Sequence, residues 1–349
     1  NDFTMLETAE AKDAATVVFH MERPYSIWPY TMAIVGIVPQ HAYSETYGQN
    51  PVGSGRYMLK QWDKGQQVIL QANPHYYGEA PKIKTVTILF MEEDAAFAAV
   101  KAGQADLAYT AASYAQQTLD GYQLLSCPTV DNRGINLPAQ KKQGDIGNDV
   151  TADIAIRKAI NMGIDREAMI EHVLSGYGKA AYSVCDNMPW CSDANKVAFD
   201  LVGAQKVLDD AGWKPGADGI RAKGDLRAQL HILYPTGDSV RQALAADLAN
   251  QLHTLGIEAT TEGVGWDVAY DRAQAEVLVW GWGAHTPMEL YNIYHTSPKT
   301  GLAQYSPYAN KDVDAYMDEA LASSDLQASY ALWQKAQTQG IVADTPWVW

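Results

Sequence analysis

The alternation of helical and strand patterns after residue 150 constrains the fold of this chain more than any other feature. Amphipathic helical patterns cover residues 200–211 and 238–255, and a glycine ends each of them. Apolar runs of strand length lie between and after them, at residues 226–234, 257–260 and 277–280. Helices that alternate with strands pack as layers on a sheet, so the pattern predicts an α/β fold.

Capping residues mark further helices in the same part of the chain. Thr151 is expected to cap a helix that runs through Ile160, and Asp165 to cap a second one that Gly176 closes. Two more helical patterns cover residues 312–323 and 325–340. The region from residue 131 onward is therefore expected to be the larger, α/β part of the molecule.

The first part of the chain is instead rich in strands and turns. Short β-rich runs predict strands at residues 16–21, 57–62, 68–70 and 86–90, and Ile34–Val38 is a further apolar run that Pro39 stops. One alanine-rich helix is expected over residues 94–102, ended by Gly103. We expect a strand-rich domain over residues 1–130 and an α/β domain over residues 131–349, with a crossover near residues 127–138.

Charge and hydropathy exclude two classes of partner. The net charge of -15 argues against nucleic acid, because neutralising phosphates requires clustered lysines and arginines. No window approaches eighteen consecutive apolar residues, so no transmembrane helix is expected. The N-terminal residues have neither a basic nor an apolar signal region, so a signal peptide is expected to have been removed or to lie outside this chain.

Cys185 and Cys191 bracket residues 186–190 in an expected loop. A short disulfide between them is the favoured interpretation, and it would place the protein in an oxidising compartment. Two buried thiols are the alternative. A zinc site is disfavoured because no second Cys or His pair lies at ligand spacing, and Cys127 is expected to pack as a small apolar residue.

No catalytic motif stands out. The sequence contains no GxSxG elbow, no HExxH pair and no GxxxxGKS loop. Residues Gly53–Ser54–Gly55 precede a strand rather than a helix, so they are not expected to hold phosphate. We expect a protein that is not an enzyme and has no catalytic residues; a glycan- or metal-dependent hydrolase is the alternative from a different class.

Several short motifs occur along the chain in a characteristic order. They are Pro51–Tyr57 (PVGSGRY), Asn73–Gly78 (NPHYYG), Gly103–Asp106 (GQAD), Gly134–Leu137, the helix pair carrying RKAIN and IDR over residues 156–166, and the AGW that ends at Trp213. In this order they resemble the extracellular solute-binding proteins of family 5, which serve ABC importers of peptides, nickel and opines. The resemblance covers essentially the whole chain.

That resemblance implies a large type II periplasmic binding protein with two lobes and with mixed sheets flanked by helices. It implies capture of a small ligand between the lobes and delivery to an ABC permease in the inner membrane. The implied location is periplasmic, or extracellular with a lipid anchor. Relatives are longer, so the chain is expected to be a fragment that lacks the N-terminal part and the C-terminal end of the proximal lobe. If the missing parts leave the cleft unformed, a purely structural role is the alternative.

The resemblance also points to a binding segment. In relatives the residues after a distal-lobe strand line the ligand cavity, and residues 280–295 match that segment. The expected ligand-binding residues are Trp282, His285, Thr286, Tyr291, Tyr294 and His295. Trp280 is expected to be core. The alternative places Trp282 in the core as well, His285 in a turn, and Tyr291 and Tyr294 on a helix surface.

The ligand class follows from how this segment departs from its relatives. Peptide-binding relatives place an Asp just after the tryptophan, whereas here no carboxylate occurs before Glu289. The Trp282–Gly283–Ala284 segment resembles nickel binders, which use a downstream histidine, so His295 and His285 are the candidate metal ligands. The arginine that nickel binders present has no match near Met32–Val38. We expect a metal chelate, with nickel as its metal and an organic molecule supplying most ligands, ahead of an oligopeptide. No cofactor is expected other than this transported chelate.

Overall fold

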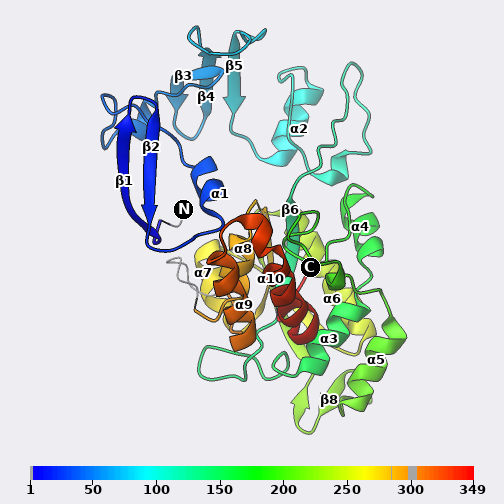
Figure 1. Ribbon diagram of the computed structural model, residues 1–349. Coiled ribbons are helices and arrows are strands. Elements are labelled where there is room, and N and C mark those ends of the chain that lie inside the picture. The colour runs from blue at the N-terminus through cyan, green and yellow to red at the C-terminus, as the bar shows by residue number, and fades with distance from the viewer. Residues whose placement is uncertain (1–2, 284, 298–304) are drawn as a thin grey trace. The chain divides into compact units, whose positions relative to one another are not determined.

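The computed structural model describes residues 3–283, 285–297 and 305–349, and the chain forms two compact units (Figure 1). One unit contains Asn1–Met32 and Leu124–Trp349, and the other contains Ala33–Gln123. Both combine sheets with helices, which confirms the predicted α/β class. The predicted lobe boundary near residues 127–138 stays a prediction; the contacts group residues 1–32 with the region after residue 124.

The larger unit is built on a five-stranded sheet of order β11-β10-β12-β6-β13. Strands β10 (Gln229–Pro235), β11 (Glu258–Val264) and β12 (Val277–Gly283) are parallel to one another. Strand β6 (Asp131–Asn136) runs antiparallel to β12 and to β13 (Trp347–Val348). Mixed sheets of this kind need both faces covered by helices.

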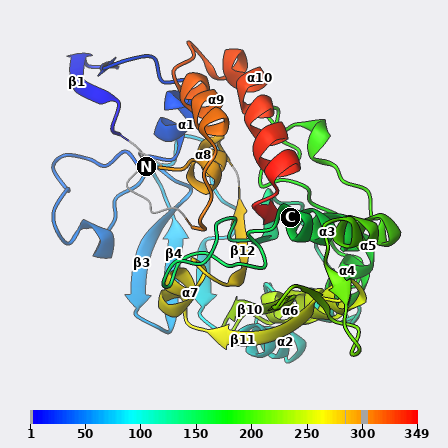
Figure 2. The same cartoon turned by 90° about the horizontal axis from the view of Figure 1, so that it is seen from below.

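Two hydrophobic cores form because side chains alternate across the sheet. In β12, Val277 and Val279 belong to one core, whereas Leu278 and Trp280 belong to the other. The first core is closed by α3 (Ile154–Gly163), α5 (Leu201–Asp210) and α6 (Ser239–Thr254). The second is closed by α7 (Trp266–Arg272), α8 (Met288–Tyr294), α9 (Lys311–Leu321) and α10 (Leu326–Gln337). Figure 2 shows α8, α9 and α10 gathered together, away from α3 and α5.

Acidic N-caps begin most of these helices, as the sequence predicts. The side chains of Asp165, Asp200 and Asp238 accept hydrogen bonds from the first turns of α4 (Arg166–Leu174), α5 and α6. The predicted cap of α3 is wrong: Asp153, not Thr151, accepts from a first-turn amide, that of Ala155. Thr151 is buried and its hydroxyl donates to the Pro138 carbonyl at 2.7 Å, so it anchors the preceding loop.

Smaller elements complete this unit. A hairpin of β1 (Leu6–Asp13) and β2 (Thr16–Met21) leads to α1 (Trp28–Ala33). Between them Ser26 binds α9, donating from its amide to Leu321 and from its hydroxyl to Ala320, both at 2.8 Å. A three-stranded sheet contains β7 (Lys214–Pro215), β8 (Arg221–Lys223) and β9 (Leu226–Arg227), and a π-helical turn covers Thr338–Asp344. The run predicted as one strand, residues 226–234, is thus divided between β9 and β10.

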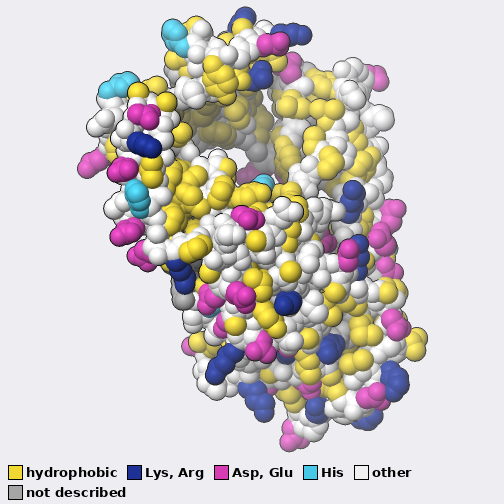
Figure 3. All heavy atoms as spheres, viewed as in Figure 1, with side chains coloured by type: hydrophobic (Ala, Val, Ile, Leu, Met, Phe, Trp, Pro, Cys, Tyr) yellow, Lys and Arg dark blue, Asp and Glu magenta, His cyan; other side chains and the backbone are white. Residues whose placement is uncertain are grey.

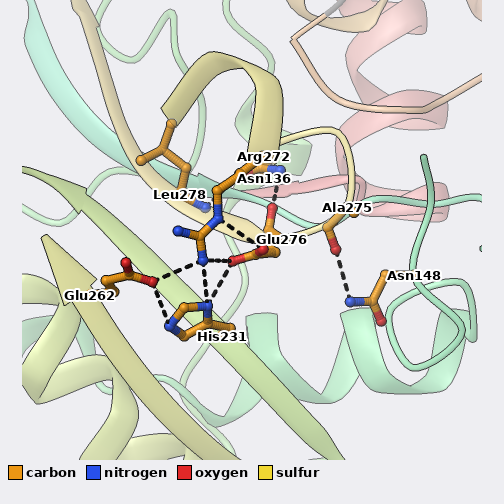
Figure 4. Close-up of polar contacts among 8 residues, drawn as sticks. All are labelled: Asn136, Asn148, His231, Glu262, Arg272, Ala275, Glu276 and Leu278. Carbon is orange, nitrogen blue, oxygen red and sulfur yellow. Dashed lines mark hydrogen bonds and ion pairs between the residues drawn. The ribbon is translucent and has the colours of Figure 1, made fainter. Parts of the chain in front are cut away.

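Asn136 joins strands β6 and β12 to the loop that precedes β12. Its side-chain amide donates to the carbonyls of Ala273 and Glu276, both at 2.9 Å. Its carbonyl oxygen accepts from the Leu278 amide at 2.7 Å and the Trp280 indole at 3.0 Å. Figure 4 shows Asn136 beside an ionic cluster of His231, Glu262, Arg272 and Glu276, in which Arg272 lies 2.9 Å from Glu262 and 2.8 Å from Glu276. These contacts fix the position of β12.

The smaller unit, residues 33–123, has an antiparallel sheet of β3 (Tyr57–Asp63), β4 (Gln67–Ala72) and β5 (Thr85–Leu89), with α2 (Glu93–Lys101) following. Short 3-10 turns cover Tyr47–Gln49 and Ala112–Tyr114. The apolar run Ile34–Val38 forms no strand, and Ile37 is 94% exposed. Figure 3 shows apolar side chains on the surface of this unit. Leu107 and Tyr109 are among its exposed apolar residues. In the part of the chain that the structure describes, no helix has the length and apolar character to cross a bilayer.

Candidate functional site at the carboxyl edge of the main sheet

The carboxyl ends of the three parallel strands form one edge of the main sheet. Strands β11, β10 and β12 end at Val264, Pro235 and Gly283, and each leads through a short loop into a helix, α7, α6 and α8. Ligands of open α/β sheets bind outside this edge, because the loops and helix N-termini there present polar groups. The predicted segment 280–295 begins at this edge.

The end of β12 has two chemically different faces. Trp280 and Trp282 lie on one face with their rings stacked, 5.1 Å apart between centroids. Trp282 also contacts Tyr305, Trp347 and Trp349 with centroid distances of 5.3, 5.5 and 6.0 Å. Trp280 is buried, as expected, while Trp282 is only half-buried. An indole at this position offers an apolar surface together with a polar N–H.

Glycines occupy the other face of the same strand. A Cβ atom on Gly281 would lie 2.6 Å from Nη1 of Arg133 and 2.6 Å from Nη2 of Arg241, so only glycine leaves room for the two guanidiniums. A Cβ atom on Gly283 would lie 3.4 Å from Nε2 of His285. Both arginines were missed by the sequence patterns above. They could be found only from their positions in the fold: Arg133 pairs with Gly281 across the strands, and Arg241 is in the first turn of α6.

The structure places His285 and Thr286 differently. His285 is exposed, close to the end of β12. Thr286 is buried, donates to Glu289 Oε2 at 3.2 Å and accepts from the Met288 amide at 3.1 Å, so it organises the start of α8. Burial raises the pKa of Glu289. Of His285 and Thr286, it is therefore His285 whose side chain solvent can reach.

Tyr291 and Tyr294 are buried in the core that includes α8 and α9, and His295, which follows α8, is also buried. The Tyr291 hydroxyl donates to Asp318 at 3.0 Å, and the Tyr294 hydroxyl accepts from the Trp349 indole at 3.0 Å. Desolvation raises the pKa of Tyr294 far above its ordinary range.

The His295 ring stacks on Tyr291 with a centroid distance of 4.4 Å. Its Nδ1 accepts from the Ser297 amide at 3.0 Å, and its Nε2 lies 3.5 Å from Asp318 Oδ1. The structure thus brings Trp282 and His285 to the sheet edge and holds Tyr291, Tyr294 and His295 between helices. Their roles toward a ligand remain predictions. Ala284, in the motif that suggested nickel, lies outside the described residues.

Among the described residues, no group of three or more His, Cys, Asp or Glu side chains is arranged to hold a metal ion. His285 and His295 lie in different surroundings, one exposed at the sheet edge and the other buried beside Asp318. A metal bound here would therefore need donors from its own organic ligand.

The three cysteines are free thiols in the structure, so the predicted Cys185–Cys191 disulfide is not formed in it. Each thiol of this pair has its own partner: Cys185 donates to Gln337 Oε1 at 3.2 Å, and Cys191 to Asp186 Oδ1 at 3.6 Å. Burial raises the pKa of Cys185. Cys127 is exposed rather than packed, contrary to expectation, since the loop around it has no covering element.

Comparison with known proteins gives a consistent set of relatives. The profile of the bacterial extracellular solute-binding proteins, family 5 Middle, matches residues 1–304. Protein XP55 of Streptomyces lividans is 32% identical over 348 residues, which cover 96% of this chain and 62% of XP55. The oligopeptide-binding protein AppA of Bacillus subtilis is 27% identical over 99% of this chain and 66% of AppA. The chain therefore spans less than two thirds of the length of these curated relatives.

Solved structures show the same fold. NikZ from Campylobacter jejuni in complex with Ni(L-His) superposes with a TM-score of 0.82 at 21% identity, over 99% of this chain and 71% of NikZ. AppA of Bacillus subtilis in complex with a nonapeptide superposes with a TM-score of 0.75 at 26% identity, over 98% of this chain and 71% of AppA. The fold is thus shared by a protein crystallised with a nickel chelate and by one crystallised with a peptide.

Proposed function

We propose a function from one premise: this chain belongs to family 5 of the bacterial extracellular solute-binding proteins. The proposal is that it belongs to the ligand-capturing component of an ABC importer and delivers a small solute to a membrane permease. Its relatives are substrate-binding proteins rather than enzymes. The proposed location is outside the cytoplasmic membrane, either periplasmic or extracellular with a lipid anchor.

One observation supports a binding role for this chain in particular. The half-buried Trp282 and the exposed His285 both lie near the carboxyl end of β12, at the sheet edge where α/β proteins bind ligands. A flat aromatic ring next to a few polar groups is the usual composition of a small-molecule site, in which the ring supplies contact area and the polar groups fix orientation. We therefore propose Trp282 and His285 as the ligand contacts of this segment.

The ligand that we propose is a metal chelate, with nickel as the metal. His285 supports this choice, because an accessible neutral imidazole is a good ligand for Ni(II). The chelating molecule would supply the remaining donors. His295, although buried beside Asp318, is the second candidate and would have to become accessible to reach a ligand.

A short peptide is the second candidate ligand. The sequence similarity to AppA, named as an oligopeptide-binding protein, favours it. Trp282 would serve a peptide equally well, because an indole can pack against many side chains. The two candidates therefore share the same place in the fold and differ in whether His285 contributes.

A thermal-shift and calorimetric titration separates these ligands. A ligand that binds only the folded state raises the melting temperature with its concentration relative to Kd. A chelate carrier is stabilised by Ni(II) with L-histidine, and by neither component alone. A peptide carrier is stabilised by a pool of short peptides instead. Stabilisation by neither the nickel mixture nor the peptides would contradict both proposed ligands.

Variants at Trp282 test the proposed contact. We expect Trp282→Ala to weaken binding of the stabilising ligand by about tenfold to a hundredfold, since a buried aromatic contact is lost. Because Trp282 packs on four other aromatic rings, Trp282→Phe is the matched variant that keeps an aromatic ring there. Unchanged affinity in a folded Trp282→Ala protein would remove Trp282 from the site.

A further inference from the structure

A groove in the smaller unit is built from residues that the candidate site does not use. One wall is the chain around the end of the 3-10 turn Tyr47–Gln49, the other is the second half of strand β3, and the volume between them is about 300 Å³. Every residue that lines the groove belongs to residues 33–123, so the groove is formed within one unit. A space of this size is at the lower end of the range for small-molecule sites.

A bulge in β3 brings consecutive side chains to this groove. In a regular strand, neighbouring side chains point to opposite faces of the sheet. The pairing of β3 with β4 shifts between Leu59 and Gln61, so Lys60 is the extra residue of a β-bulge. As a result Lys60, Gln61 and Trp62, three residues in a row, are all exposed and all line the groove. Bulges redirect side chains in this way next to functional sites.

One tyrosine holds the opposite wall in place. The Tyr47 hydroxyl donates to the Val52 carbonyl at 2.5 Å and accepts from the Val52 amide at 3.2 Å, which closes residues 47–52 into a loop. Gln49 and Asn50 lie in this loop and line the groove. No hydrogen bond among the described residues uses either of their side-chain amides. Both amides can therefore donate to a ligand and accept from it.

Two lysines of the groove keep their charges free. Within the described ranges, neither Lys60 nor Lys64 forms an ion pair with a carboxylate. The carboxylate between them in sequence, that of Asp63, accepts hydrogen bonds from the side-chain amides of Gln67 at 2.7 Å and Gln61 at 2.9 Å, which lower its pKa. Amides rather than lysines thus satisfy this carboxylate, and the two ammonium groups are left for a ligand.

An aromatic ring lies beside these charges. Trp62 is 42% exposed, and Nζ of Lys64 lies over its ring, 5.6 Å from the centroid. This cation–π contact keeps an ammonium group next to an apolar surface. Residues 56–84 contain five basic and two acidic residues, so this region is positive in a chain whose net charge is -15. Such a local field attracts anions.

The combination of groups favours an acidic sugar over a simple anion. Inorganic phosphate would use only the ammonium groups. A sugar ring has C–H faces that pack on an indole, and hydroxyls that exchange hydrogen bonds with amides such as those of Gln49 and Asn50. A uronic acid adds a carboxylate, which ammonium groups bind.

We propose that this groove binds an acidic saccharide, with the sugar ring on Trp62 and its carboxylate at Lys60 and Lys64. The inference goes beyond the proposed function, because it assigns a second ligand to residues that have no part in the proposed solute site. It holds whether the transported solute is a chelate or a peptide.

Calorimetry at low ionic strength tests the ligand class. The probes are trigalacturonate and its fully methyl-esterified form, in which the same sugars carry no charge. We expect the acid to bind about threefold to tenfold more tightly than the ester, and added salt to reduce this difference, because the lysines are exposed. Inorganic phosphate at equal ionic strength should not displace the acid. Absence of binding, equal affinity for acid and ester, or displacement by phosphate overturns the proposal.

Substitutions in the groove test its location. The double variant Lys60→Gln/Lys64→Gln should bind trigalacturonate about threefold to tenfold more weakly and should no longer distinguish it from the ester. Trp62→Ala should weaken both forms about threefold to tenfold, because the ring contact is lost. Lys101→Gln and Tyr109→Ala are the matched controls: both side chains are exposed in the same unit, neither lines the groove, and both affinities should stay unchanged.

The double lysine variant decides the proposal even if Trp62→Ala fails to fold, because its side chains are exposed and form no ion pair among the described residues. A preference for the acid that persists in this folded variant overturns the proposed site. The same variant should keep any stabilisation that the nickel mixture or the peptide pool gives the parent. Failure of the saccharide site therefore leaves the proposed function standing, and failure of the proposed solutes leaves the saccharide site standing.

Discussion

At the scale of single residues, the segment after β12 combines an exposed imidazole with a carboxyl group in an unfavourable environment. Glu289 is largely buried at the start of α8 and its partner is the Thr286 hydroxyl. Desolvation raises its pKa above the ordinary value of 4.5. The unfolded chain therefore loses this proton at lower pH than the folded protein does, and stability falls as the pH rises above 4.5.

Glu289→Gln removes this titration while keeping an oxygen that can accept from Thr286. We expect the variant to have a higher melting temperature than the parent at pH 7, and the difference to disappear near pH 4, where the carboxyl is protonated in both states. Thermal denaturation at a series of pH values measures this difference. A constant difference across the series would contradict the assigned cause.

Glu258→Gln is the matched control, for which the expected change in stability at pH 7 has the opposite sign. Hydrogen bonds from Gln229 and Arg227 lower the pKa of Glu258, so its ionised form is the one that the fold favours. A carboxyl of this kind adds stability above its unfolded pKa and loses that contribution as the pH falls through its folded pKa. The variant should therefore be slightly less stable than the parent at pH 7.

At the scale of elements, the main sheet depends on one buried amide. Asn136 is fully buried and connects β6 to the backbone of β12 and to the loop before it. Replacing it by alanine leaves several buried backbone groups and the Trp280 indole without partners. We expect Asn136→Ala to destabilise the protein by about 3 kcal/mol, since each orphaned buried group costs about 1–3 kcal/mol.

Urea unfolding measures this loss, and Gln229→Ala is the matched control. Gln229 is an exposed amide on strand β10 of the same sheet, and its side chain binds only the half-buried Glu258 among the described residues. Its removal should change the free energy of unfolding by less than about 1 kcal/mol. Equal effects of the two substitutions would show that Asn136 does not hold the sheet together.

At the scale of the whole molecule, the two units differ in their hydrophobic cores. In the described part of residues 33–123, the buried apolar side chains are Pro81, Ala99, Val100 and Ala111, whereas the larger unit contains two extensive cores. Free energy of local opening rises with buried apolar contact. The smaller unit should therefore open more readily than the larger one.

Hydrogen exchange followed by mass spectrometry tests this expectation. We expect amides of β3, β4 and β5 to exchange about tenfold or more faster than those of β6, β10 and β12 under native conditions, since about 1.4 kcal/mol in opening free energy corresponds to a factor of ten. Limited proteolysis should likewise cut first within residues 33–123. Equal protection of the two sets of strands would contradict this difference in stability.

The amino-acid sequence by itself determined the fold class, the family and most of the elements of this protein. Those features depend on local and ordered signals: apolar periodicity, acidic caps such as Asp165 and Asp238, closing glycines and the order of short motifs. Thr151 was misassigned because Thr151 and Asp153 are both good caps, and only the hydrogen bond that the threonine hydroxyl donates to the Pro138 carbonyl separates them.

The tertiary structure alone decided which side chains meet. His285 and His295 are ten positions apart in one segment, yet one is exposed and the other is buried against α9. Arg133 and Arg241 are remote in sequence, and their meeting over Gly281 depends on β6 pairing with β12 and on α6 covering that face. A one-dimensional pattern records which residues can form a helix or a strand, but proximity across a sheet arises only when the strands pair.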